Sequence, residues 1–287
     1  MPELTDLSVI RTLCEKYDFA LSKGFGQNFI INPGLPPKIV DASGVDKSWG
    51  VLEIGPGIGA LSHELCERAG KVVAVEIDKT LLPILDETMA RFDNFEVVSA
   101  DILKTDIPAL VREKFAGLTP IVCANLPYNI TTPAITALIE SKCFESITVL
   151  VQKEVAERLC AAPGTSAYGA FSVFMQYYTE PELLFAVPRE CFEPQPKVTS
   201  AVLRAVVRRE PPVEVEDEKF FFRVVYAAFA LRRKTLVNSL MTAFGSQLTK
   251  EQVTQAVTSC GLEANIRGER LGLSEFAALS AEIAALL

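Results

Sequence analysis

One tetrapeptide in the sequence combines hydrogen-bond acceptors with an aromatic face. Asn125-Leu126-Pro127-Tyr128 follows Ile121–Ala124, an apolar segment typical of a buried strand. The exocyclic amine of adenine is a weak nucleophile because its lone pair is delocalised, and it needs acceptors more than a strong base. The Asn125 side-chain oxygen and the Leu126 carbonyl can accept its hydrogens, while Pro127 restricts the loop. Tyr128 offers a stacking surface worth roughly 1–3 kcal/mol. A plain Asn-x-Pro turn is the structural alternative.

A glycine-rich loop is the second candidate site. Gly55-Pro56-Gly57-Ile58-Gly59 follows the strand-like Val51–Ile54, and its glycines permit a sharp turn and a close approach to a ligand. The spacing also fits a dinucleotide fingerprint, so NAD remains possible. The acids Glu53, Glu76 and Asp101, without a basic phosphate clamp, suit a positively charged ligand such as S-adenosylmethionine better than a pyrophosphate.

These residues depend on a sheet that brings them together. Short Val- and Ile-rich segments alternate with helical patterns such as Gly59–Ala69 and Thr80–Phe92, which predicts an α/β, Rossmann-like fold with a parallel sheet. Ligands of such sheets bind beyond the carboxyl ends of the strands, where all the residues above would lie. The expected strands are Gly50–Ile54, Val72–Glu76, Phe95–Ala100, Ile121–Ala124 and Ile147–Val151, with Leu183–Val187 and Ser200–Arg208 as a closing antiparallel pair.

A change of composition divides the chain. The segment Glu210–Glu218 contains two prolines and five acids and predicts a linker. We therefore expect a catalytic domain over residues 1–209 and a small all-α domain over 210–287. The helices expected in the second domain are Lys219–Phe229, Arg232–Phe244, Lys250–Ser259 and Ser274–Leu286.

Composition excludes several classes of protein. The 287 residues carry a net charge of −8, which rules out a uniformly basic nucleic-acid binder, and 49% are hydrophobic, which rules out global disorder. No apolar run is long enough to cross a membrane, and no secretory leader is recognised. The single histidine, His63, and seven scattered cysteines give no metal-ligand pattern. We expect a cytoplasmic protein with reduced thiols, no bound metal and no membrane association.

Several further motifs resemble the family of rRNA adenine N6-dimethyltransferases. The similarity extends over roughly Leu21 to Leu279, and the combination of motifs is more specific than any one of them. Its segments are Lys23–Ile30, Glu53–Gly57, Asn125–Tyr128, Gln152–Leu159, Phe192–Ser200 and Arg232–Leu236. The resemblance implies a class I methyltransferase that uses S-adenosylmethionine to dimethylate two adjacent adenines in a hairpin loop near the 3′ end of small-subunit (16S) rRNA, within an assembling subunit.

The resemblance also implies roles for individual residues. Phe192 would lie on the target base opposite Tyr128, with core packing as its alternative, and would join the catalytic set Asn125, Leu126, Pro127 and Tyr128. The residues implied to bind the cofactor are Gln27, Asn28, Ile30, Gly55, Gly57, Glu76, Ile77, Asp101, Ile102 and Asn125.

Basic residues gather in one part of the acidic chain. Between Lys219 and Leu240 there are five bases and no acid, so the rest of the chain carries −13. Such clustering favours contact with RNA phosphates over a merely solvated helix face. The candidate RNA contacts are Lys23, Lys197, Arg223, Arg232, Arg233 and Lys234. We expect the protein to be a monomer.

Three alternative functions remain open from the sequence. The first is a sister methyltransferase that modifies large-subunit rRNA and confers macrolide resistance. The second is a non-catalytic ribosome-assembly factor, although the intact Asn125–Tyr128 motif argues against lost catalysis. The third is an NAD-dependent oxidoreductase.

Overall fold

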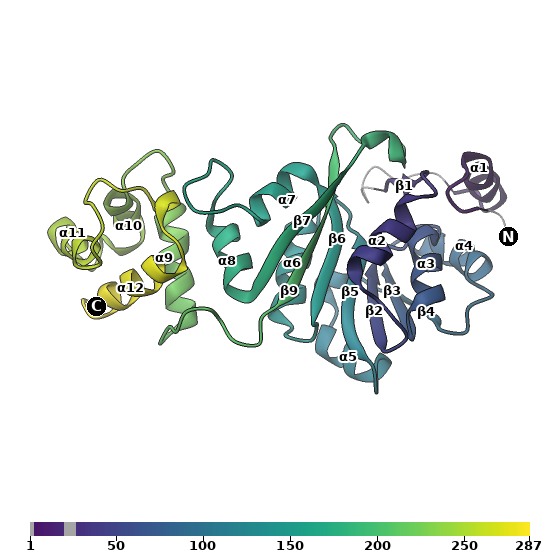
Figure 1. The fold of residues 1–287 in the computed structure, drawn as a ribbon, viewed down its shortest axis with the longest axis horizontal. Helices are drawn as coiled ribbons and strands as arrows, with labels where there is room; N and C mark the ends of the chain where they lie inside the picture. The colour runs from purple at the N-terminus through teal and green to yellow at the C-terminus, as the bar shows by residue number, and fades with distance from the viewer. Residues whose placement is uncertain (1–2, 20–26) are drawn as a thin grey trace. The chain divides into compact units, whose positions relative to one another are not determined.

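The computed structural model describes residues 3–19 and 27–287. Contacts within it divide the chain into two compact units. The first unit comprises Met1–Ala156 and Glu182–Val207, and the second comprises Glu157–Pro181 and Arg208–Leu287. Figure 1 follows the chain through both units.

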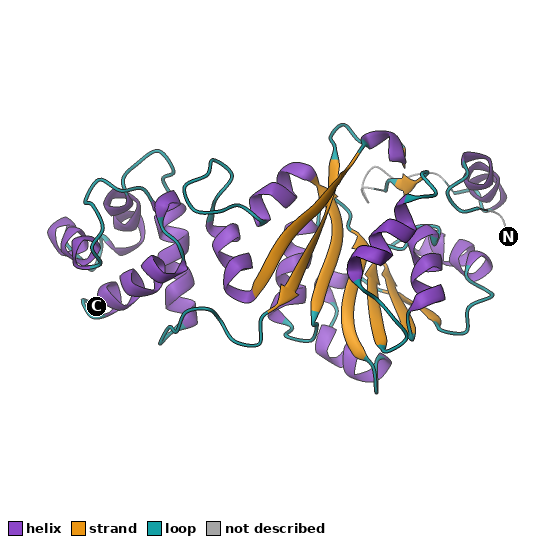
Figure 2. Ribbon diagram, viewed as in Figure 1, coloured by secondary structure: helices purple, strands orange, loops and turns teal. Residues whose placement is uncertain are grey.

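A seven-stranded sheet forms the centre of the first unit (Figure 2). All seven expected strands are confirmed, with ends that differ by up to four residues. Their order across the sheet is β4-β3-β2-β5-β6-β9-β7. The strands are β2 (Trp49–Ile54), β3 (Lys71–Glu76), β4 (Phe95–Ser99), β5 (Thr119–Asn125), β6 (Ser146–Gln152), β7 (Thr179–Val187) and β9 (Ser200–Val207).

The direction of the strands sets which residues meet at each edge. The pairs β2·β3, β2·β5, β3·β4 and β5·β6 are parallel, so the carboxyl ends of five strands lie at one edge. β9 runs antiparallel to β6 and therefore begins at that same edge. We predicted that β7 and β9 would close the sheet as a pair, and the structure shows that β9 also pairs with β6.

Helices pack along the sheet and supply the crossovers that parallel strands require. The apolar side chains of Ile39 on α2 and Leu65 on α3 are fully buried in one core with Val51, Val72 and Ile121 of the sheet. The helices of this unit are α1 (Leu7–Lys16), α2 (Leu35–Ser43), α3 (Ala60–Arg68), α4 (Leu82–Thr88), α5 (Ile107–Lys114) and α6 (Thr131–Glu140).

Two very short strands were not predicted. β1 (Phe29–Ile30) pairs antiparallel with β8 (Phe192–Glu193), so that Ile30 lies opposite Phe192. Strands of two residues carry too little periodicity to be found in a sequence. This pairing joins two motifs that are more than 160 residues apart and brings Asn28 to the edge of the sheet described above.

Helices around a separate apolar core form the second unit. Phe221, Leu240, Val253 and Phe276 are fully buried in that core. α10 begins at Leu236 rather than at the expected Arg232, because Thr235 caps it by accepting the N–H of Asn238. The helices that lie wholly within this unit are α8 (Ala170–Tyr178), α9 (Glu218–Phe229), α10 (Leu236–Phe244), α11 (Lys250–Ser259) and α12 (Leu273–Ala284), while α7 (Lys153–Leu159) spans the division between the units.

The expected boundary after residue 209 lies two residues from the observed one after Val207, but residues 157–181 also belong to the second unit. Residues 157–181 pack with the C-terminal helices. The Tyr168 hydroxyl donates to the Leu271 carbonyl at 2.9 Å, and the Gly164 N–H donates to the Glu269 carbonyl at 2.7 Å. Tyr168 is almost fully buried in the core of the second unit. The proline- and acid-rich composition of residues 210–218 indicates where the chain leaves the sheet. It cannot indicate that residues 157–181, which come earlier in the chain, pack in the second unit.

Candidate active site

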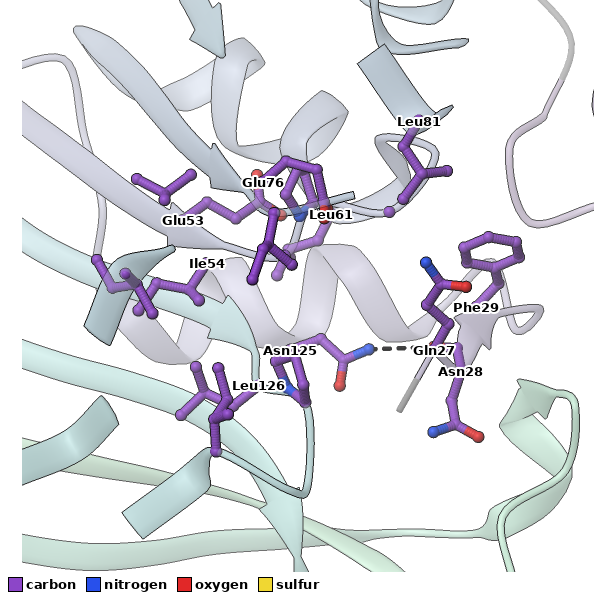
Figure 3. Close-up of a pocket in the computed structure, with 18 of the residues that line it drawn as sticks. Gln27, Asn28, Phe29, Glu53, Ile54, Leu61, Glu76, Leu81, Asn125 and Leu126 are labelled. Carbon is purple, nitrogen blue, oxygen red and sulfur yellow. Dashed lines mark hydrogen bonds between the residues drawn. The ribbon is translucent and has the colours of Figure 1, made fainter. Parts of the chain in front are cut away.

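A cavity opens at the carboxyl edge of the sheet in the first unit (Figure 3). Its walls come from the segment before β1, the loop after β2, and the ends of β3, β4 and β5. All ten residues expected to bind the cofactor line it, as do Leu126, Pro127 and Tyr128. The structure thus brings together every described residue of the predicted cofactor set and four of the five residues of the predicted catalytic set.

The glycine loop after β2 takes a backbone shape that side chains rarely adopt. Gly55, Gly57 and Gly59 have φ values of 68°, 60° and 96°. A Cβ atom on Gly57 would also lie 3.2 Å from the Phe29 ring, a tight contact, so the conformation favours glycine there and the space adds to that preference. The glycines therefore let the backbone pass close to the cavity.

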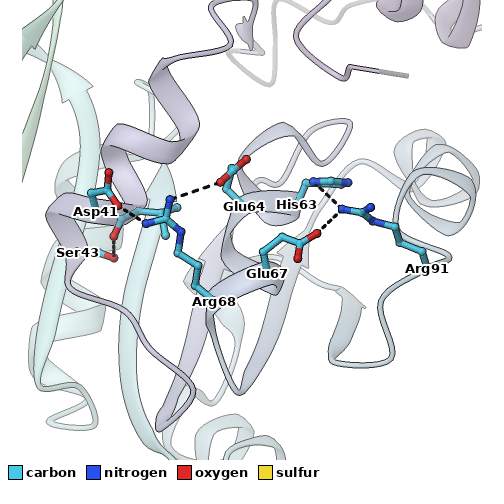
Figure 4. Close-up of polar contacts among 8 residues, drawn as sticks. Asp41, Ser43, His63, Glu64, Glu67, Arg68 and Arg91 are labelled. Atoms are coloured by element: carbon cyan, nitrogen blue, oxygen red, sulfur yellow. Dashed lines mark hydrogen bonds and ion pairs between the residues drawn. The ribbon is translucent and has the colours of Figure 1, made fainter. Parts of the chain in front are cut away.

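The helix that follows this loop is held in place by ion pairs (Figure 4). On α3, Arg68 pairs with Asp41 of α2, and Glu67 pairs with Arg91. His63 Nδ1 lies 3.4 Å from the guanidinium of Arg91, and its ring packs edge-on against Phe92. His63 does not line the cavity, and these contacts give it a structural role on α3.

Glu76 lies at the end of β3 with its carboxylate at the cavity. It is 5% exposed, and its Oε1 accepts the Asp78 N–H at 2.8 Å. Burial raises the pKa of this carboxyl to about 7. A buried acceptor at this position can receive hydrogen bonds from ligand hydroxyls.

Glu53 is the more deeply buried acid of the cavity wall. It is 1% exposed, and its Oε2 has no hydrogen-bond partner. Burial raises the pKa of Glu53 to about 8. At neutral pH Glu53 therefore keeps its proton, so that this part of the cavity wall does not carry a buried charge.

We expect Glu53 to make the protein less stable as pH rises. The pKa of Glu53 is higher in the folded than in the unfolded state, so between about pH 4.5 and 8 the folded protein retains a proton that the unfolded chain has lost. The free energy of unfolding should fall across this window by roughly a few kcal/mol. Urea denaturation from pH 5 to 9 measures this, and Glu53→Gln should reduce the slope to the part that Glu76 contributes. The exposed control Glu154→Gln should not, and equal slopes for wild type and Glu53→Gln would contradict this assignment.

Asp101 and two apolar side chains form the outer wall of the cavity. Asp101 caps the turn after β4 by accepting the Leu103 N–H at 3.0 Å, and its other oxygen lies 3.5 Å from Lys104 Nζ. Ile102 is buried, whereas Ile77 is 49% exposed. An exposed aliphatic side chain beside a cavity is well placed to cover a flat ring.

Asn125 ends β5 and points into the cavity (Figure 3). Its Nδ2 donates to the carbonyl of Asn28 at 3.3 Å, which fixes the amide and leaves Oδ1 as the acceptor. The next residue, Leu126, donates its N–H to the Leu150 carbonyl at 3.1 Å. The loop is thus attached to β6 on one side and to the segment before β1 on the other.

Phe192 is not brought to the cavity. It is 1% exposed and packs in the core behind the sheet with Val187 and Val202. The structure therefore shows core packing, the alternative that we considered for this residue, and a contact with the target base would require the ring to move. Its position on β8, opposite Ile30, explains why the side chain is enclosed.

Sequence reasoning missed some of the residues that shape the cavity. Phe29 and Leu81 line it while packing in a small core with Ile10 and Leu13 of α1. Asp78 is 7% exposed and accepts from Gln27 Nε2 at 2.8 Å. Apart from its position two residues after Glu76, nothing in the sequence marks Asp78 as a partner of a residue 51 positions earlier.

The candidate RNA contacts are spread over both units. In the second unit, Arg232, Arg233 and Lys234 are exposed in the turn before α10, and Arg232 donates to the Ser166 carbonyl. Arg223 lies over the Phe244 ring and donates to the Ala243 carbonyl at 3.2 Å. Lys197, in the first unit, is exposed. The expected contact Lys23 lies outside the described residues.

Other features of the described chain bear on possible ligands. Residues 3–19 and 27–287 contain no group of three or more His, Cys, Asp or Glu side chains arranged to hold a metal ion. All seven cysteines fall within these ranges, and each is a free thiol. No helix within the same part of the chain is long and apolar enough to cross a membrane.

The fold and the cavity define a class of enzyme. A seven-stranded α/β sheet with its cavity at the carboxyl edge is the architecture of class I S-adenosylmethionine-dependent methyltransferases, which confirms the predicted fold class. Residues 19–282 match the family model described as ribosomal RNA adenine dimethylase. The chain belongs to this family.

Individual relatives agree with this assignment. The chain is 48% identical over 273 residues to the ribosomal RNA small subunit methyltransferase A of Geobacillus sp. (strain WCH70), covering 94% of each chain. It is 49% identical over 280 residues to the protein of the same name from Streptococcus gordonii, covering 96% of this chain and 97% of the relative.

Solved structures extend the similarity beyond sequence. A dimethyladenosine transferase from Plasmodium falciparum has a TM-score of 0.74 and 25% identity, covering 90% of this chain and 98% of that one. The 23S rRNA methyltransferase ErmE has a TM-score of 0.69 and 25% identity, covering 90% of this chain and 100% of that one.

Proposed function

We propose that this protein uses S-adenosylmethionine to dimethylate the N6 amines of two adjacent adenines in a hairpin loop near the 3′ end of 16S rRNA, within an assembling small subunit. The observation that carries the proposal is the cavity in which the glycine loop and Asn125–Tyr128 meet. Membership of the ribosomal RNA adenine dimethylase family supports the substrate, and relatives near 48% identity bear a small-subunit name.

The acids of the cavity fit this cofactor. When bound, S-adenosylmethionine supplies a methyl group on a positively charged sulfur and so needs no further activation. The buried carboxyl of Glu76 is an acceptor in the cavity wall, and no lysine or arginine is among the described residues that line the cavity, which favours a cationic ligand over a dinucleotide. Glu76 would accept the ribose hydroxyls, and Asp101 would accept from the adenine amine.

The Asn125–Tyr128 loop would position the target amine. Oδ1 of Asn125 and the carbonyl of Leu126 accept the two hydrogens of the amine, which concentrates its lone pair on the nitrogen that attacks. Pro127 fixes the direction of the Leu126 carbonyl, and Tyr128 supports the base. No histidine is required, because positioning and electrostatics supply the rate enhancement. The target base must leave its stack, which suits an exposed loop as substrate.

Incubation with labelled S-adenosylmethionine and undermethylated small subunits tests the proposal. Dimethyladenosine should appear at two adjacent positions of 16S rRNA. Label in large-subunit rRNA instead would favour the sister methyltransferase, and binding to small subunits without any transfer would favour the assembly factor. Tighter binding of NADH than of S-adenosylmethionine would favour the oxidoreductase.

We propose that residues 210–287 contribute RNA binding through the basic turn before α10. Arg232, Arg233 and Lys234 are exposed there within an acidic chain. Replacing all three with alanine should make RNA binding less sensitive to salt. The slope of log K against log salt concentration should become shallower by about 0.7–0.9 for each phosphate that the variant no longer neutralises. Filter binding from 50 to 300 mM salt measures this, with Lys250→Ala on α11 as an exposed control. An unaltered slope would remove the turn from the RNA interface.

We propose that this protein acts as a monomer in the cytoplasm. The seven free thiols suit a reducing compartment, which is also where ribosomal subunits assemble. Analytical ultracentrifugation at micromolar protein concentration measures the mass in solution. A mass twice that of the chain would contradict a monomer.

A further inference from the structure

A side-chain hydrogen bond connects the candidate catalytic loop to Ser200, a residue with no role in the function described so far. The Tyr128 hydroxyl lies 2.6 Å from Oγ of Ser200. Ser200 is completely buried, whereas Tyr128 is partly exposed and lines the cavity. The Ser200 hydroxyl is therefore shielded from water, and it bonds to a side chain that faces the ligand site.

The strand order explains how these two residues meet. β9 runs antiparallel to β6, so its first residue, Ser200, pairs with Gln152 at the carboxyl end of β6. The adjoining Lys153 N–H donates to the Thr199 carbonyl at 2.9 Å, which fixes the start of β9. The Asn125–Tyr128 loop leaves β5 at the same edge, one strand away. Ser200 is thus held by the sheet while Tyr128 projects from a loop.

We propose that Ser200 is a positioning residue that holds the ring of Tyr128 in the orientation needed to stack on the target adenine; the proposal rests on the proposed function of Tyr128. Pro127 restricts the backbone on one side of Tyr128, but the ring can still turn about its own side-chain bonds. A hydrogen bond from the far end of the ring to a rigid strand restricts rotation about the Cα–Cβ bond, because that rotation would move the hydroxyl away from Ser200. Ser200 itself does not line the cavity.

A double-mutant cycle tests this role. Ser200→Ala and Tyr128→Phe each remove the same hydrogen bond, so each should lower kcat by about three- to tenfold, the change expected from removing one hydrogen bond. Combining them should lower kcat no further than either change alone. Calorimetric affinity for S-adenosylmethionine should stay at the wild-type value in all three variants. Ser146→Ala, a buried serine at the opposite end of the same strand pair, is the matched control and should retain wild-type kcat.

The outcomes separate this inference from the proposed function. If Ser200→Ala lowers kcat equally in wild type and in the Tyr128→Phe background, Ser200 acts independently of Tyr128 and the inference is wrong. If Tyr128→Ala abolishes methyl transfer while Ser200→Ala is fully active, the inference fails and the role of Tyr128 stands. If Tyr128→Ala is itself fully active, the assigned role of Tyr128 fails as well. Thermal melting of Ser200→Ala beside Ser146→Ala shows whether a lower kcat reflects impaired folding.

Discussion

Asn125→Ala is expected to lower kcat for methyl transfer by about 10²–10³, the loss typical of removing one preorganised hydrogen-bonding group from an active site. The side-chain oxygen of Asn125 is held ready because Nδ2 donates to the Asn28 carbonyl at 3.3 Å. Alanine removes both the acceptor for the target amine and this tether. Single-turnover assays with saturating cofactor and small-subunit rRNA measure the chemical step directly.

The same variant should retain most of its affinity for the cofactor. The acids and the glycine loop that would hold most of S-adenosylmethionine lie on or directly after β2, β3 and β4, whereas Asn125 ends β5. We therefore expect the Kd for S-adenosylmethionine, measured by calorimetry, to change by a much smaller factor than kcat. Asn265→Ala, in an exposed loop of the second unit, makes the same chemical change and should be fully active. Full activity of Asn125→Ala would remove Asn125 from the catalytic role.

Glu76→Ala should weaken binding of S-adenosylmethionine by about 10²-fold, since hydrogen bonds to a charged acceptor are worth roughly 1.5–3 kcal/mol each and two ribose hydroxyls are available. Its carboxylate is 5% exposed and faces the cavity at the end of β3. Isothermal calorimetry measures the change. Glu96→Ala, on the neighbouring strand but paired with lysines outside the cavity, should bind the cofactor as wild type does.

The pH dependence of that affinity provides a second test of Glu76. Burial raises the pKa of this carboxyl to about 7, so much of the free protein carries a proton there near neutral pH. The ionised form is the better acceptor for ribose hydroxyls, and wild-type affinity should therefore increase from pH 6 to pH 8. Glu76→Ala should show a shallower profile over this range, with the remaining slope set by Glu53. Equal affinities for wild type and variant at pH 8 would show that Glu76 does not hold the ribose.

The class of fold could be predicted from the sequence because its signals are local. Val- and Ile-rich segments such as Val72–Glu76 are followed by turn residues and helical patterns, and parallel strands require such crossovers. The cavity was predictable for the same reason, since the carboxyl ends of parallel strands share one edge. Glu76, Asp101 and Asn125 each end or follow a different strand and still line one cavity.

Contacts between distant segments could not be predicted in this way. Phe192 has the same aromatic side chain whether it stacks on a base or packs in a core, and only its place on β8 opposite Ile30 decides that it is buried. Likewise, residues 157–181 contain no signal that directs them to the C-terminal helices, because the attraction is between apolar surfaces that exist only after folding.

By itself, the sequence determined the chemistry that this protein has available: an acidic, glycine-lined cofactor loop and an acceptor motif that needs no histidine. The tertiary structure decided how those groups are held. It tied Asn125 to Asn28, left Oε2 of Glu53 without a partner and connected Tyr128 to Ser200. The physical reason is that hydrogen-bond geometry and burial depend on strand order and register, which bring together residues up to 97 positions apart in these contacts.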